Sequence, residues 1–270
     1  MRAATTFSAL LILAAVARSS AADLGPVACE GAYPAHLQGV CADGEGSIFW
    51  SFTDQLVKTD RDGEIARKVE VPWHHGDLCL VDGKLYIAVN LGKFNDPKGN
   101  ADSWVYVYDA DDLALLAKHA TPEAFHGAGG IAFHDGKFMV VGGLPDDVTE
   151  NYVYEYDPDF KFVKRHVLES GHTQLGIQTA AFADGRWWFG CYGKRKTADA
   201  PATPPILLTA DADLKKVRRF EFDGSLGILP LGGGKFLIAR GGNPEGKGQI
   251  GRLVPAVADV ERGLKIVERP

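Results

Sequence analysis

The 270-residue sequence lacks the short motifs by which many enzymes are recognised. It contains no Gly-x-Ser-x-Gly elbow, Gly-rich phosphate loop, Cys-x-x-Cys pair or His-Glu-x-x-His motif. It also lacks an excess of basic charge, because its formal net charge is −6, which argues against a nucleic-acid partner. Any site must therefore be assembled by the fold from residues that are distant in the sequence.

Long hydrophobic runs are absent beyond the N-terminus. There, Arg2 precedes an apolar run at residues 7–16 and small residues at 19–22, which is typical of a signal peptide. The run is too short to span a membrane. We therefore expect residues 1–22 to be a signal peptide and residues 23–270 a single secreted or periplasmic domain. We expect that domain to be a monomer with no membrane span.

Cysteine is scarce, with four residues at positions 29, 41, 79 and 191. Export would permit disulfides, but their pairing cannot be deduced from the sequence. Cys41 and Cys79 occupy equivalent places in two successive repeats, directly after apolar strand residues. We interpret these two thiols as small buried side chains.

A repeat is the main feature that the sequence does contain. Turns of the Asp-Gly or Gly-Gly type precede apolar strands at Asp82, Asp135, Asp184 and Gly233, with spacings of 53, 49 and 49 residues. Such turns are strong hairpin signals. Asp-rich turns, which we interpret as turns rather than calcium loops, end the following strand of each unit.

The repeat predicts an all-β fold, a five-bladed β-propeller of four-stranded antiparallel blades. The segment 29–34 is a candidate edge strand that would close the ring onto the last blade. The inner strands are predicted to begin near His36, His75, His126, Leu175 and Ser225.

Five of the eight histidines stand at the starts of these inner strands, so a closed ring would gather them at one mouth. We predict a site for Zn, Fe or Mn, because rigid strands carrying neutral imidazoles suit transition metals. Two alternatives stay open: histidines that bind a polar ligand or transfer protons, and histidines that only cap strands. The predicted metal ligands are His36, His75, His126 and His172, and the predicted catalytic residues are His75, His126 and Asp77, with Asp77 orienting an imidazole.

Polar residues at strand starts and strand ends are predicted to line the same mouth, with two long loops at 91–103 and 193–205. Cations among them would hold a carboxylate or phosphate, and we place Lys194 with them. The predicted ligand-binding residues are Gln38, Asn90, Lys93, Gln178, Tyr192, Arg195 and Arg240.

The stretch Gln38-Gly39-Val40 and the Asp-Gly-Lys/Arg hairpins at Asp82, Asp135 and Asp184 resemble those of exported bacterial propellers. That broad group includes gluconolactonase-like (SMP-30/NHL type) and glutaminyl-cyclase-like proteins. The resemblance implies a propeller with an axial site. Gluconolactonase-like proteins hold a metal through Glu, Asn and Asp, whereas no Glu stands at an inner strand start here.

We therefore expect a histidine-lined axial site that binds a small molecule or oligosaccharide. The first hypothesis is a metal-assisted hydrolase or lyase that acts on an anionic carbohydrate or a related small molecule. The alternative is a propeller that binds a ligand or a protein without catalysis.

Overall fold

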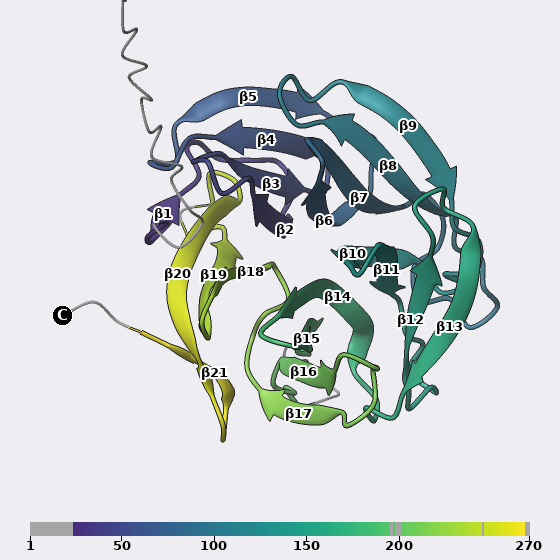
Figure 1. The fold of residues 1–270 in the computed structure, drawn as a ribbon. Helices are drawn as coiled ribbons and strands as arrows, with labels where there is room; N and C mark the ends of the chain where they lie inside the picture. Colours follow the sequence, from purple (N-terminus) through teal and green to yellow (C-terminus); the bar gives the residue numbers. More distant parts are fainter. Residues whose placement is uncertain (1–23, 195–196, 198–200, 245, 268–270) are drawn as a thin grey trace, which may run out of the picture.

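Five antiparallel sheets are arranged around a central axis in the computed structural model, which describes residues 24–194, 197, 201–244 and 246–267 (Figure 1). The first blade contains β2 (Leu37–Ala42), β3 (Ile48–Phe52), β4 (Gln55–Thr59) and β5 (Ile65–Glu70). The second contains β6 (His75–Val81), β7 (Lys84–Asn90), β8 (Ser103–Asp109) and β9 (Leu115–Ala120). The third contains β10 (Ala128–His134), β11 (Lys137–Gly142), β12 (Asn151–Tyr156) and β13 (Phe162–Leu168).

The fourth blade contains β14 (Gln174–Ala183), β15 (Arg186–Tyr192), β16 (Ile206–Asp211) and β17 (Arg218–Glu221). The fifth contains β18 (Ile228–Gly232), β19 (Lys235–Gly242), β20 (Ile250–Asp259) and β21 (Gly263–Ile266). The predicted five-bladed propeller is thus confirmed. No helix long and apolar enough to cross a membrane occurs in the part of the chain that the structure describes.

The predicted hairpins have the backbone geometry that their sequences require. Asp82, Asp135 and Asp184 adopt φ values of 49°, 49° and 50°, and the glycine after each also has a positive φ. Two successive residues at positive φ give the turn whose twist matches that of the flanking strands. The hairpin turns therefore place the inner two strands of the second, third and fourth blades in register.

The ring is closed by the short strand β1 (Val27–Ala28), which pairs with β20 through Val27 and Leu253. A backbone bridge from Tyr33 to Gln249 continues this contact. The segment 29–34, expected to form the closing strand, contributes that bridge and a hydrogen bond from the Cys29 N–H to the Gly251 carbonyl at 2.9 Å. Strand β21 pairs with β20 further along, so both ends of the described chain contribute to the fifth blade.

The hydrophobic core lies between neighbouring blades. Trp187 packs in the cluster between blades three and four, whereas the next residue, Trp188, packs in the cluster between blades four and five. Phe49 and Trp50 divide in the same way between the two neighbours of the first blade. Because successive strand residues point to opposite faces, each blade is buried on both sides.

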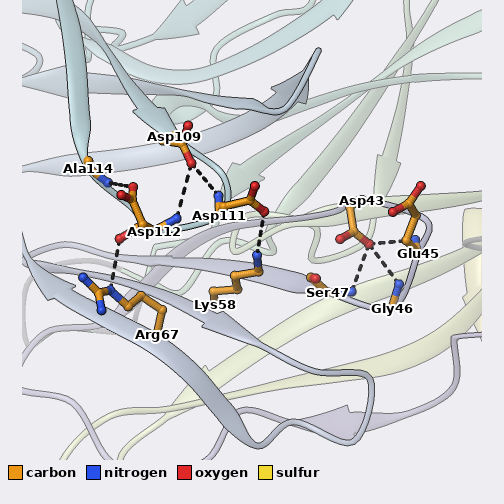
Figure 2. Close-up of polar contacts among 10 residues, drawn as sticks. All are labelled: Asp43, Glu45, Gly46, Ser47, Lys58, Arg67, Asp109, Asp111, Asp112 and Ala114. Atoms are coloured by element: carbon orange, nitrogen blue, oxygen red, sulfur yellow. Dashed lines mark hydrogen bonds and ion pairs between the residues drawn. The ribbon is translucent and has the colours of Figure 1, made fainter.

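Aspartates in the hairpin turns and in the Asp-rich turns accept hydrogen bonds from the backbone of their own turn. The Asp43 carboxylate accepts hydrogen bonds from the N–H groups of Glu45, Gly46 and Ser47 at 2.7–2.9 Å (Figure 2). The Asp109 carboxylate caps its turn likewise, and Asp111 forms an ion pair with Lys58 of the neighbouring blade at 3.4 Å. Their oxygens are engaged as the turn interpretation predicts.

Candidate functional site

The middle of the axis is occupied by a buried carboxyl group. Asp77, on β6, accepts a hydrogen bond from the N–H of Ala180 on β14 at 3.0 Å and further bonds from the N–H groups of Leu78 and Val40. Gly39 lies so close that an added Cβ would overlap Asp77. Burial raises the pKa of Asp77 well above its usual range.

Asp77 therefore ties three inner strands together. We expected it to orient an imidazole, but its carboxyl group bonds to backbone N–H groups instead. The reason is its depth: it lies two residues inside the strand, where the inner strands approach one another and their axial N–H groups need acceptors.

His75 is buried within the second blade. Its Nδ1 donates to the Pro72 carbonyl at 2.7 Å, so its Nε2 accepts from the Tyr108 hydroxyl at 2.9 Å. Burial lowers its pKa to about 4, which keeps the ring neutral. Tyr108 belongs to β8, the third strand of the blade, so His75 turns away from the axis, although we predicted it as a metal ligand and catalytic residue.

The mouth of the ring carries a chain of hydrogen-bonded side chains. The Tyr192 hydroxyl donates to Gln38 Oε1 at 3.1 Å and lies 3.4 Å from His36 Nε2. The Gln38 amide nitrogen lies 2.9 Å from His74 Nε2, to which it donates. These residues come from the starts of the first two inner strands and from the end of β15.

Loss of contact with solvent sets the charge states of these hydrogen-bonded side chains. Partial loss of solvent lowers the pKa of His36, which is an exposed residue, and burial lowers that of His74 to about 4, with the neighbouring His36 as a further cause. Burial also raises the pKa of Tyr192. At neutral pH the mouth thus holds two neutral imidazoles beside a protonated phenol, a set of groups that can accept and donate protons.

A cavity of about 760 Å³ opens beside these hydrogen-bonded side chains, and its volume is within the range of small-molecule sites. His36 and Tyr192 line it together with Lys194, a cation. Asp223 also lines it, and its carboxylate accepts hydrogen bonds from the N–H and hydroxyl of Ser225. The other lining residues are Gly193, Ala202, Thr203, Pro205, Ser225, Leu226, Gly241, Gly242 and Gln249.

A second cavity, of about 720 Å³, shares Tyr192, Lys194 and Thr203 with the first. Two backbone hydrogen bonds, one in each direction between Lys194 and Thr203, hold this shared edge in place. His172 and Arg219 are among the residues that line the second cavity alone. Lys194 therefore lines both cavities.

His126 and His172, the other predicted metal ligands, lie apart from the hydrogen-bonded side chains at the mouth. His126 Nδ1 bonds to the Asp96 carbonyl at 3.1 Å, and His172 Nδ1 bonds to the Val148 carbonyl at 3.0 Å. Each histidine is thus held by its own local loop. Within residues 24–267, apart from the few positions the structure does not describe, no three His, Cys, Asp or Glu side chains lie together as a metal-ligand group. The expected Zn, Fe or Mn site therefore stays a prediction.

Several predicted ligand-binding residues form hydrogen bonds to backbone groups. Asn90 accepts from Gly92 and Asp102 and so closes the 91–102 loop. Gln178 donates to the Leu175 carbonyl at 2.7 Å. Their side chains make these bonds because they stand where loops meet strand ends.

The predicted cations do not share one role. Arg240 donates to the carbonyls of Asp223 and Ala239 and lies over the Phe222 ring. Lys93 is exposed on the 91–102 loop. Arg195 lies outside the described residues, so Lys194 is the predicted cation that the structure places at the first cavity.

His74 lies at the mouth, although it was not among the predicted ligands. The signal was the pair His74-His75, because adjacent residues at a strand start point to opposite sides. One of the two had to face the mouth. Thr53, whose hydroxyl lies 3.4 Å from the Gln38 amide nitrogen, had no sequence signal.

Neither family models nor curated proteins include a match to this chain. Its fold is similar to that of solved structures. A GH43 β-1,3-galactosidase determined with galactodeoxynojirimycin is 14% identical, covers 90% of this chain and 99% of its own, and gives a TM-score of 0.58. A protein of unknown function from Bacteroides caccae is 18% identical, covers 86% of this chain and 81% of its own, and gives 0.49.

The similarity to the galactosidase structure shows the fold alone. The chain is a five-bladed β-propeller, and that part of the expected resemblance is confirmed. Membership of the gluconolactonase-like and glutaminyl-cyclase-like group is not confirmed.

Proposed function

We propose that this propeller binds an anionic carbohydrate in the first mouth cavity and cleaves it as a lyase, after export. The observation that carries the proposal is the contact of Tyr192 with His36 beside Lys194. The galactosidase with the same fold was determined with a sugar-like compound, which makes carbohydrates the first ligand class to test. The N-terminal pattern at residues 1–22 supports export.

The proposed chemistry needs a cation, a base and an acid. Lys194 pairs with the carboxylate of a uronic acid unit, which makes the neighbouring C–H more acidic. Neutral His36 removes that proton through Nε2, a carbon–carbon double bond forms, and the glycosidic carbon–oxygen bond at the next carbon breaks. Tyr192 protonates the departing oxygen and then regains its proton from the His36 imidazolium. No water is consumed.

Hydrolysis by paired carboxylates has less support. Glycosidases of that kind place two carboxyl groups on either side of the scissile bond. Among the described residues lining the first cavity, Asp223 is the single carboxylate, and Ser225 engages it. We therefore assign no hydrolytic step and no step through a metal.

The test is turnover of uronic acid oligosaccharides by the purified chain, followed by the ultraviolet absorbance of the unsaturated product. Tyr192→Phe should reduce kcat by about 10²–10⁴-fold, the range for loss of a proton donor. Wild-type kcat should fall on the acid side only below pH 6.5, because the pKa of His36 is lowered. Unfolding midpoints should show that the variants are folded.

Tyr152→Phe is the matched control, because that hydroxyl bonds to Glu150 on the third blade rather than at the mouth. It should leave kcat unchanged. Equal turnover by Tyr192→Phe and wild type would contradict the assignment of Tyr192 as the acid. Failure of the wild type to bind or cleave any acidic carbohydrate would contradict the proposed function itself.

The second candidate is a binding propeller without catalysis. It is favoured by the engagement of the Tyr192 hydroxyl with Gln38 Oε1, which is a shorter contact than that with His36. In this case acidic oligosaccharides bind, Lys194→Met weakens binding, and no product forms. Titration calorimetry beside the turnover assay separates the two functions.

A further inference from the structure

One tryptophan of this chain is open to solvent while the others are not. Trp73 is 62% exposed, whereas Trp50, Trp187 and Trp188 are buried and Trp104 is partly buried. An exposed indole is a large flat apolar surface with a polar edge. Its position relative to the mouth therefore decides what it can contact.

Trp73 directly precedes His74, and their ring centres lie 5.8 Å apart with the rings edge to face. The His74 ring centre lies 6.4 Å from that of His36, which lines the first cavity. Trp73 thus lies at the far end of a short path of rings that begins in the cavity. Leu91, 42% exposed, follows Asn90, whose N–H donates to the His74 carbonyl.

The backbone on both sides of Trp73 is fixed. The Pro72 carbonyl accepts from His75 Nδ1 at 2.7 Å, and the His74 carbonyl accepts from the Asn90 N–H at 3.2 Å. Val71 is held as well, since its N–H donates to the Asp54 carbonyl at 2.9 Å. An exposed side chain on a fixed backbone binds with little loss of conformational entropy.

We infer that Trp73 is a stacking platform for a sugar ring and that the ligand is an oligosaccharide reaching from the first cavity across His74. This rests on the proposed function and deepens it. The C–H face of a pyranose ring is apolar and fits a flat indole, whereas a phosphate or a small carboxylate has no such face. A single ring in the cavity does not reach Trp73, so the ligand holds more than one unit.

The experiment compares a galacturonic acid trimer with the monomer by titration calorimetry. Trp73→Ala should weaken trimer binding about tenfold and leave monomer binding within about twofold, because only the longer ligand stacks. Trp73→Phe should keep most of the trimer affinity. Unfolding midpoints of these variants should match the wild type, since the side chain is exposed.

Tryptophan fluorescence supplies a second measurement. The trimer should shift the wild-type emission to the blue and protect it from acrylamide, and Trp73→Phe should lose both effects. Trp104→Phe, which removes the partly buried indole bonded to Asp102, is the control and should keep them.

The outcomes separate the two proposals. Trimer binding that is unchanged in Trp73→Ala, with equal affinity for monomer and trimer, would overturn the platform while the proposed function stands. Absence of binding of either acidic sugar to the wild type would overturn both.

Discussion

The inner strands carry two polar layers that differ in how completely their groups are used. In the axial layer, Asp77 is buried and bonds to backbone N–H groups on three strands. In the mouth layer, Tyr192 bonds to both His36 and Gln38, and His36 and Tyr192 also line a cavity. In the second blade the two layers are three residues apart, from His74 to Asp77.

The difference teaches that depth along the inner strand decides the role of a polar side chain. Deep in the ring, backbone donors are within reach and water is excluded, so a carboxyl group stabilises the fold. At the strand start the neighbours are side chains and solvent, so the same chemistry stays open to a ligand. Substitutions in the two layers should therefore act on different observables.

The largest effect is expected at Asp77. Asp77→Ala leaves buried N–H groups without an acceptor and should lower the free energy of unfolding by roughly 3–5 kcal/mol. Asp77→Asn keeps an acceptor oxygen and should cost much less. Urea unfolding of both variants checks this, and equal destabilisation by Ala and Asn would show that the carboxyl oxygens do not hold the strands.

The adjacent histidines give the next largest effect. His75→Ala removes two hydrogen bonds and leaves a cavity in the second blade, which should cost roughly 2–4 kcal/mol of unfolding free energy. His74→Ala removes the one bond to Gln38 and should cost less than about 1 kcal/mol. It should, however, weaken binding of acidic oligosaccharides.

Chemical denaturation and titration calorimetry of both variants measure these two quantities. A His74→Ala variant as unstable as His75→Ala would remove the distinction between the mouth histidine and the buried one.

A smaller effect is expected from pH. Burial lowers the pKa values of His74 and His75 to about 4 in the folded protein, so the unfolded chain binds more protons below pH 6.5. Stability should therefore fall from pH 7 to pH 5, by roughly 2 kcal/mol for each histidine. Asp77 has the opposite sign, because its raised pKa lets the folded state take up a proton as the pH falls.

The pH effect is best measured in the Asp77→Asn background, where that carboxyl group no longer titrates. Adding His75→Gln should remove about half of the loss of unfolding free energy that the two histidines cause between pH 7 and pH 5. If His75→Gln leaves the slope of unfolding free energy against pH unchanged, His75 does not stay neutral in the folded state.

The sequence predicted the architecture because the repeat is carried by local signals. Asp82, Asp135 and Asp184 each demand a positive φ, and the apolar residues after them define a strand without reference to distant residues. The inner strand starts predicted near His75 and His126 lie close to the observed starts of β6 and β10. Closure by β1 had no comparable signal, because two residues carry no pattern.

The site was less predictable because side-chain direction is not local. The predictions at His36, Gln38 and Tyr192 name residues that the structure brings together at the mouth. The partner of Asp77, Ala180, lies 103 residues away in the sequence, and no pattern in either segment indicates the contact. For the histidine pair, a shift of one position decided which ring faces the mouth.

The seam between β1 and β20 also has a mechanical meaning. The backbone closes the ring there through two paired residues, a bridge and a few hydrogen bonds, beside apolar packing of the first blade on the fifth, whereas each hairpin within a blade is continuous in the chain. A force applied to the two ends of the domain would load this seam first and peel it one bond at a time. Once the apolar packing between the first and fifth blades is also broken, the ring would open and the mouth, which joins residues of the first and fourth blades, would be disrupted.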